Sequence, residues 1–159
     1  MDGGRIRAVV AAGVAVLALA TGCATEPGTA QWERDLADAE ARWHAAALRN
    51  YTLSLVRTCD CVSGQTRPIT VTVLNGAFTG LVYADSLGGA ADTTLFQQYL
   101  TVDRYFTLLH QVLASGPYDF SAIYNQSIGF PISVTVNPER MTTGDEFLVA
   151  IYAFTAGSP

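Results

Sequence analysis

Two kinds of hydrophobic period alternate along this chain, and their order limits its fold more than any other feature. Between Gln31 and Asn50, apolar residues recur with the 3.6-residue period of an amphipathic helix, at Trp32, Leu36, Ala39, Trp43 and Ala46. A second helix is predicted after Thr101, a suitable N-cap, and ends at Gly116-Pro117, because proline cannot continue a helix. We expect both tryptophans of the first helix to lie in the core.

Six short segments are predicted to be strands, over residues 51–55, 69–73, 78–83, 119–124, 130–136 and 146–154. The first two alternate apolar and hydroxyl residues, the period of a half-buried strand. Asn75-Gly76 predicts a tight hairpin, because both turn positions need a positive φ, whereas residues 85–94 predict a loose loop. Strands joined by short turns indicate an antiparallel sheet. The predicted fold class is therefore α+β, in the order helix, three strands, helix, three strands, with about six strands in one sheet and both helices on one face.

The start of the chain predicts export. Arg5 and Arg7 precede an apolar run from Ala8 to Ala20, and Gly22-Cys23 follows, which is the order of a secretory signal peptide. A membrane-spanning helix is the alternative, but 13 residues at ~1.5 Å each cover roughly 20 Å of a hydrocarbon core ~30 Å thick. We predict a lipoprotein signal peptide over residues 1–22, a tether over 23–30 and a single α+β domain over 31–155.

Gly22-Cys23 resembles the lipobox of bacterial lipoproteins, in which the cysteine is acylated and becomes the first residue of the mature chain. Ala20 departs from that motif, because Leu is usual at this position. A plain secreted protein cut near Ala20 or Gly22 is the alternative, but it would export an unpaired cysteine on a flexible tail. We therefore predict lipid attachment at Cys23 and a location at the cell membrane, facing the extracytoplasmic side.

The net negative charge of the predicted mature chain limits the kinds of partner that it can bind. Residues 23–159 carry seven Arg against 13 Asp and Glu, and the whole chain has no Lys. So acidic a domain is poorly suited to phosphate backbones, and we expect no nucleic acid partner. The absence of Lys excludes Schiff-base chemistry. The partners that we expect are the membrane, through the lipid, and an unknown envelope protein or small ligand.

Cys59-Asp60-Cys61 is the one constellation with chemical character. Two strand steps of ~3.3 Å separate the cysteine Cα atoms by roughly 6.6 Å, the upper edge of disulfide geometry. Val62-Ser63-Gly64 offers a turn that would shorten this distance, and an oxidising compartment favours the bond. We predict a structural disulfide between Cys59 and Cys61, with no metal and no cofactor. A redox-active disulfide and a copper or zinc site are the alternatives, and only His44 and His110 offer imidazole to such a metal.

No catalytic residue is assigned. The carboxyl groups that could pair for acid–base chemistry belong to Asp103, Asp119, Asp145 and Glu146, although helix and turn positions explain each of them. We favour a non-catalytic, lipid-anchored envelope domain with a binding or structural role, which would use the face of its sheet that the helices leave uncovered. The alternatives are a thiol-redox or metal-handling lipoprotein acting through Cys59 and Cys61, and an enzyme built from the acidic residues.

Several short motifs occur in order over residues 43–154. They are Tyr51-Thr52-Leu53, Cys59-Asp60-Cys61, Asn75-Gly76, Thr101-Val102-Asp103 with Phe106, Tyr124-Asn125, Gly129-Phe130-Pro131 and Asp145-Glu146. In this combination the chain resembles a family of bacterial envelope proteins of unknown function, whose members are secreted or lipid-anchored single domains. Asn125 and Asn137 depart from that pattern, which tends to carry Asp at both positions. If those acids bind a cation in relatives, this chain would bind it less well. The resemblance implies no assigned activity.

Overall fold

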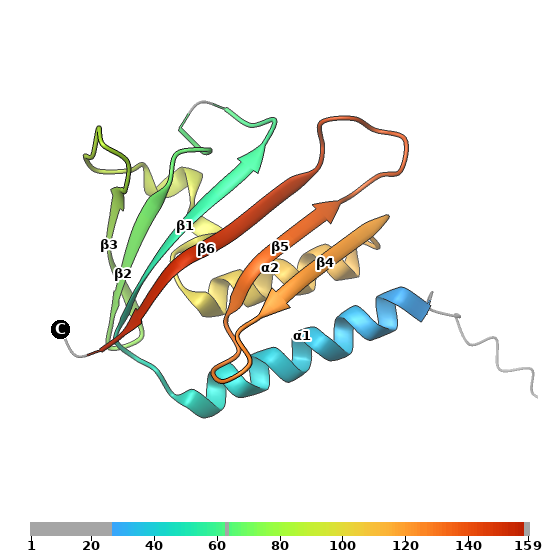
Figure 1. Ribbon diagram of the computed structural model, residues 1–159, viewed down its shortest axis with the longest axis horizontal. Helices are drawn as coiled ribbons and strands as arrows, with labels where there is room; N and C mark the ends of the chain where they lie inside the picture. The colour runs from blue at the N-terminus through green and yellow to red at the C-terminus, as the bar shows by residue number, and fades with distance from the viewer. Residues whose placement is uncertain (1–26, 63, 158–159) are drawn as a thin grey trace, which may run out of the picture.

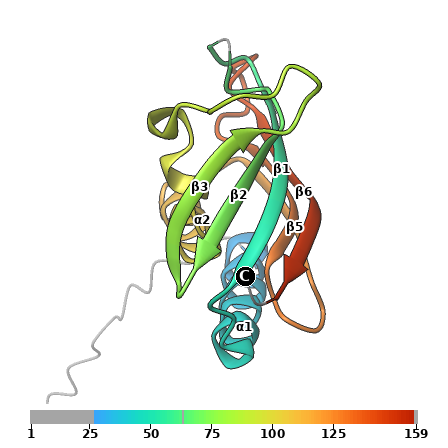
Figure 2. The ribbon, with the colours of Figure 1, turned by 90° about the vertical axis from the view of Figure 1, so that its left-hand side faces the viewer.

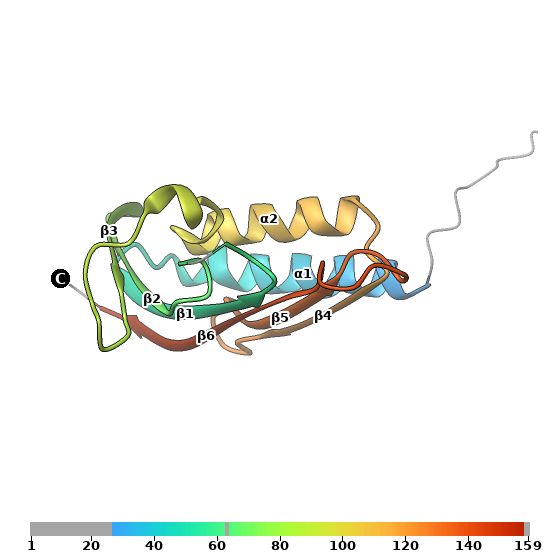
Figure 3. The same cartoon turned by 90° about the horizontal axis from the view of Figure 1, so that it is seen from above.

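The computed structural model describes residues 27–62 and 64–157, which form two helices and a six-stranded antiparallel sheet. In chain order the elements are α1 (Pro27–Ala46), β1 (Tyr51–Cys59), β2 (Ile69–Leu74), β3 (Ala77–Tyr83), α2 (Val102–Ala114), β4 (Asp119–Tyr124), β5 (Pro131–Asn137) and β6 (Phe147–Ala156). Both helices lie on one face of the sheet, as Figure 1 and the view from above in Figure 3 show. The α+β class and the element order predicted from the sequence are therefore confirmed.

The sheet joins two three-stranded meanders through its middle. Its strand order is β3-β2-β1-β6-β5-β4, so the central contact is between the first strand of one meander and the last strand of the other. That pairing runs from Tyr51 opposite Ala156 to Cys59 opposite Phe147, with one register shift after Ser54. Figure 2 shows β3, β2, β1 and β6 side by side from the end of the sheet. β3 and β4 are the two edge strands.

The predicted hairpin between β2 and β3 is present, and Asn50 takes part in it. Asn75 and Gly76 have φ values of 53° and 79°, the left-handed conformations that a tight hairpin needs. The Asn75 amide donates to Oδ1 of Asn50 over 2.7 Å, and the Gly76 amide donates to the carbonyl of Arg49 over 2.7 Å. The sequence predicts a first helix that extends to Asn50, but α1 ends at Ala46. The Asn50 side chain instead accepts a hydrogen bond from the turn between β2 and β3.

The first helix also begins earlier than the apolar pattern indicates. α1 starts at Pro27 rather than at Gln31, within the segment predicted to be a tether. Proline suits the first helical position, because its φ is already helical and its missing N–H has no partner there in any helix. The apolar stripe gives no sign of this first turn, because its earliest member is Trp32.

Aromatic residues hold α1 against the sheet. Trp43 is 3% exposed, and its ring lies edge-on to Tyr51 and Phe154, with centroids 5.3 and 6.1 Å away. Trp32 is only half-buried and packs against Phe120, with ring centroids 5.8 Å apart. The expectation that both tryptophans are core residues therefore holds fully for Trp43 alone.

The second helix has the start that its sequence predicts. The Thr101 side chain accepts a hydrogen bond from the Arg104 amide over 3.1 Å, which satisfies one of the free donors of the first turn. The Tyr51 hydroxyl accepts another from the Val102 amide over 3.0 Å. Burial raises the pKa of Tyr51 to about 12, so this hydroxyl stays protonated at neutral pH. Tyr51 thus links β1 to the start of α2.

The segment 85–94 is more ordered than the expected loose loop. A 3-10 turn (Thr93–Leu95) and a second one (Gln97–Tyr99) bring Phe96 and Tyr99 into the core. Asp85, at its start, accepts two hydrogen bonds from the Arg67 guanidinium over 2.6 and 2.7 Å. Small and polar residues dominate the sequence of this segment, so it gives little sign of the two buried aromatics that follow.

Replacing Trp43 with Ala should lower the free energy of unfolding by about 3–5 kcal/mol, because a large buried ring leaves a cavity that the backbone cannot fill. Trp32→Ala is the matched control and should cost clearly less, because that ring is half exposed. Urea unfolding followed by circular dichroism measures both. Equal losses for the two variants would show that α1 does not dock through Trp43.

Candidate functional site

The predicted signal peptide and the predicted lipid-attachment residue, Cys23, lie outside the described residues. Over residues 27–62 and 64–157, neither helix combines the length and the apolar character that crossing a bilayer requires. The candidate sites below are therefore those of the folded domain.

Cys59 and Cys61 lie at disulfide distance at the end of β1, with Cα atoms 5.2 Å apart. The chain turns as it leaves the strand, which brings the Cα atoms within the usual range for a disulfide. Both residues are half exposed. Disulfide formation in the exported protein, and its structural role, stay predictions.

The two histidines lie together on the seam between α1 and α2. Nε2 of His110 is 2.7 Å from Oε2 of Glu40, and Nε2 of His44 is 3.7 Å from the other oxygen of the same carboxylate. Nδ1 of His44 is also 3.9 Å from Asp103, which accepts a hydrogen bond from the indole N–H of Trp43 over 3.2 Å. Within the described ranges, no three His, Cys, Asp or Glu residues are arranged to hold a metal ion.

This arrangement separates the histidines from the cysteines. Trp43, next to His44, packs against Tyr51 at the start of β1, whereas Cys59 ends that strand. Eight strand steps of ~3.3 Å place the two ends roughly 26 Å apart. The structure therefore does not bring His44 beside the sulfurs.

The acidic candidates are likewise spread over separate elements. Asp103 lies in the first turn of α2, and Asp119 begins β4. Asp145 and Glu146 precede β6, where the Glu146 carboxylate accepts a hydrogen bond from the Gly144 amide. Among the described residues, no hydrogen bond joins two of these carboxyl groups, so the structure gives no support to an acid–base pair here.

The uncovered face of the sheet carries hydroxyl side chains together with exposed apolar ones, among them Val82, Ile123 and Tyr152. Register places Ser54 opposite Thr70 on this face, and their hydroxyls share a hydrogen bond of 2.8 Å. Ser121 lies opposite Thr135 in the other half of the sheet. These hydroxyls can satisfy one another and water, and nothing in this face indicates what would cover it.

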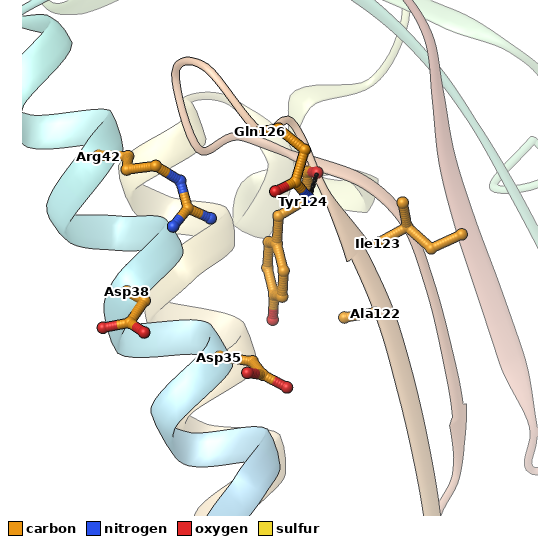
Figure 4. Close-up of a pocket in the computed structure, with 7 residues that line it drawn as sticks. All are labelled: Asp35, Asp38, Arg42, Ala122, Ile123, Tyr124 and Gln126. Atoms are coloured by element: carbon orange, nitrogen blue, oxygen red, sulfur yellow. Dashed lines mark hydrogen bonds between the residues drawn. The ribbon is translucent and has the colours of Figure 1, made fainter.

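A groove between α1 and the edge strand β4 is a stronger candidate, and the sequence did not point to it. It encloses about 350 Å³ and is lined by Asp35, Asp38 and Arg42 on one wall and Ala122, Ile123, Tyr124 and Gln126 on the other. Figure 4 shows Arg42 and Asp35 extending from α1 toward Tyr124, whose ring lies between the helix and β4. The groove thus combines two carboxylates, one guanidinium and one phenol.

The turn after β4 builds this groove. The Asn125 side chain accepts hydrogen bonds from the amides of Ser127 and Ile128, and the Gly129 amide donates to the Asn125 carbonyl. Gly129 has a φ of 87° and touches α1 so closely that a Cβ there would lie 2.0 Å from the carbonyl oxygen of Ala39. Only glycine fits both the conformation and the contact. The motif Tyr124-Asn125 with Gly129-Phe130-Pro131 therefore fixes the distance between α1 and β4.

Arg42 enters the groove without a partner. It stands four residues after Asp38, the spacing at which opposite charges on a helix usually pair. In the part of the chain that the structure describes, however, Arg42 makes neither a salt bridge nor a side-chain hydrogen bond, and its Nε is buried and unsatisfied. Its Cβ would lie 3.0 Å from a Cβ at Gly129, so the turn passes close to the base of this side chain. Figure 4 shows its guanidinium lying toward Tyr124.

Tyr124 is the second unsatisfied group. Its side chain is 7% exposed, and among the described residues its buried hydroxyl has no hydrogen-bond partner. The hydroxyl lies on the Asp35 side of the groove in Figure 4. Burial raises the pKa of Tyr124 well above its usual value, and the Asp35 carboxylate adds to the rise. The phenol therefore stays protonated at neutral pH and can bind a ligand, but it cannot serve there as a base.

A model of a family of unknown function, DUF6174, matches residues 35–156. The chain belongs to this family. The match covers α1 from Asp35 onward and every strand, so it includes both walls of the groove and the turn that positions them. No curated protein is significantly similar to the chain. Because the function of DUF6174 is unknown, membership of this family does not indicate an activity for the domain.

The sequence patterns place Tyr124 in a family motif, but they assign no binding role to Tyr124 or to Arg42. A basic residue in the second half of a helix ordinarily complements the helix dipole, and an aromatic at the end of a strand ordinarily packs. The available signal was Gly129, four residues beyond the Asn125 turn, since a glycine flanked by apolar residues often marks a close approach of two backbone segments.

Gly129→Ala should destabilise the DUF6174 domain far more than Gly116→Ala. Both glycines have positive φ, but a Cβ at Gly116 meets nothing within 4 Å, so that control carries only the conformational cost of about 1 kcal/mol. At Gly129 the added atom also collides with the backbone of α1. Urea unfolding of both variants measures the difference. Similar losses would mean that the turn does not rest on α1.

Proposed function

We propose that this chain is a lipid-anchored protein of the cell envelope, whose domain binds a small polar ligand in the groove between α1 and β4 without catalysing a reaction. The observation that carries the binding role is the pair of unsatisfied polar atoms in the groove, Nε of Arg42 and the hydroxyl of Tyr124. A buried polar group without a partner costs free energy, and such groups are few in folded proteins. A ligand that satisfies both would recover that cost.

The protonated state of Tyr124 supports binding over catalysis. A general base needs a pKa near the working pH, and burial moves this phenol in the opposite direction. Arg42 stays charged throughout the physiological range and contributes a fixed set of donors. The phenol and the guanidinium of the groove therefore suit recognition and not proton abstraction.

The anchor would hold the groove close to the membrane. Only residues 24–26 separate Cys23 from the first residue of α1. Asp35 follows Pro27 by eight helical steps of ~1.5 Å, so the groove begins roughly 12 Å along the helix. A short link and a nearby groove suit a small ligand better than a large protein approaching from the membrane side.

Cys23→Ser should move the protein from the membrane fraction to the soluble fraction of the envelope without unfolding it. Stable attachment needs two or more acyl chains, since one alone binds reversibly, and Ser offers no thiol for the lipid. Fractionation after a salt wash, with circular dichroism of the released protein, makes the measurement. A variant that stays with the membrane would contradict the lipid anchor.

The groove itself can be tested before its ligand is known. The detergent-solubilised full chain is heated with a panel of acetate, inorganic phosphate, ethylamine, glucose and free amino acids, and the Tm is compared with and without each compound. We expect at least one class to raise the Tm, because a compound that binds only the folded state stabilises it. The gain should disappear in Arg42→Gln.

Arg34→Gln is the matched control, because Arg34 lies on the same helix but is exposed and bonded to Gln31 instead of the groove. It should keep the gain in Tm. Without any compound, Arg42→Gln should be at least as stable as the parent, since it removes a buried donor that has no partner. Gains that survive Arg42→Gln, or a panel with no gain at all, would overturn ligand binding in this groove.

A further inference from the structure

We infer that the groove binds a free α-amino acid, with its carboxylate on Arg42 and its ammonium on Asp38. This inference rests on the proposed binding role of the groove and names the class of ligand. The observation behind it is that the two residues line the same groove, one helical turn apart, and are not paired with each other among the described residues.

The unpaired state of Asp38 and Arg42 is what makes both charges available. Residues at this spacing have Cβ atoms about 5–6 Å apart and ordinarily form an ion pair on an exposed helix. Here Arg42 lies toward Tyr124, and the described structure shows no salt bridge between it and Asp38. Asp35 is partly engaged, because one of its oxygens accepts a hydrogen bond from Gln31 over 2.7 Å. Asp38 is therefore the freer carboxylate.

The charges of the groove exclude simpler ligands. A lone anion such as phosphate or acetate would be attracted by Arg42 but repelled by Asp35 and Asp38 on the same wall. A lone amine would be attracted by the two carboxylates but repelled by Arg42. A molecule that carries both charges a single carbon apart offers each side chain a group of opposite charge, with which it can form a charge-assisted hydrogen bond.

The remaining walls fit the rest of such a molecule. The protonated hydroxyl of Tyr124, on the Asp35 side of the groove, is a further donor without a partner among the described residues. Ala122 supplies a small apolar surface on β4. The groove volume of about 350 Å³ leaves room for a single amino acid and its bound water.

Calorimetric titration of the full chain with L-leucine, N-acetyl-L-leucine and L-leucinamide tests the inference. Acetylation removes the ammonium charge, and the amide removes the carboxylate, so each should bind at least tenfold more weakly than leucine. Other free amino acids are titrated in the same way, so that the preference of the groove for the ligand's side chain is measured as well. The detergent and buffer are the same in every titration.

Two variants test which protein side chain binds the ammonium group of the ligand and which binds its carboxylate. Asp38→Asn should weaken leucine at least tenfold and leave N-acetyl-leucine unchanged, because the acetylated ligand has no ammonium to lose. Arg42→Gln should weaken leucine and leave leucinamide unchanged. Arg34→Gln and Asp119→Asn, which change charges outside the groove, should bind leucine as the parent does.

The possible results distinguish the amino acid ligand from the proposed binding role of the groove. N-acetyl-leucine or leucinamide binding as tightly as leucine would overturn the amino acid ligand, because one charge would then suffice. Arg42-dependent binding of another panel compound, with no free amino acid bound, would also overturn it while leaving the groove a binding site. Failure of every panel compound would remove the proposed function itself.

Discussion

The close contact between Gly129 and the backbone of α1 is the constraint on which the groove depends. It places the turn after β4 against Ala39, so the helix lies beside the edge strand at a fixed distance. The Arg42 guanidinium lies toward Tyr124 in the same region. This one backbone contact therefore sets how closely α1 and the turn after β4 approach each other, and with it the width of the groove.

Local structure was largely predictable, because local rules decide it. The hairpin at Asn75-Gly76 and the N-cap at Thr101 depend on residues within a few positions, and both appear as expected. Hydrophobic period located the two helices and six strands. The pairing of β1 with β6 joins segments about a hundred residues apart, and nothing in either segment encodes that register.

The candidate site was not predictable for a similar reason. Asp38 and Arg42 look like an ordinary helical ion pair in sequence, and Tyr124 looks like a packed aromatic. Their state as separate, unsatisfied groups arises only when α1 meets a turn more than 80 residues further along the chain. The predicted sites were instead clusters close in sequence, such as Cys59 and Cys61, which the structure does bring together.

The same geometry explains why a site of this kind persists at a cost to the fold. Pairing Asp38 with Arg42 or replacing Arg42 would relieve a buried donor, and sequence drift toward stability would be expected to do so. A groove that keeps opposite charges apart is stable only while the turn holds them, and it becomes fully satisfied only when a ligand carries both complementary charges. The helix nearest the predicted anchor forms one wall of the groove, and the edge strand β4 forms the other.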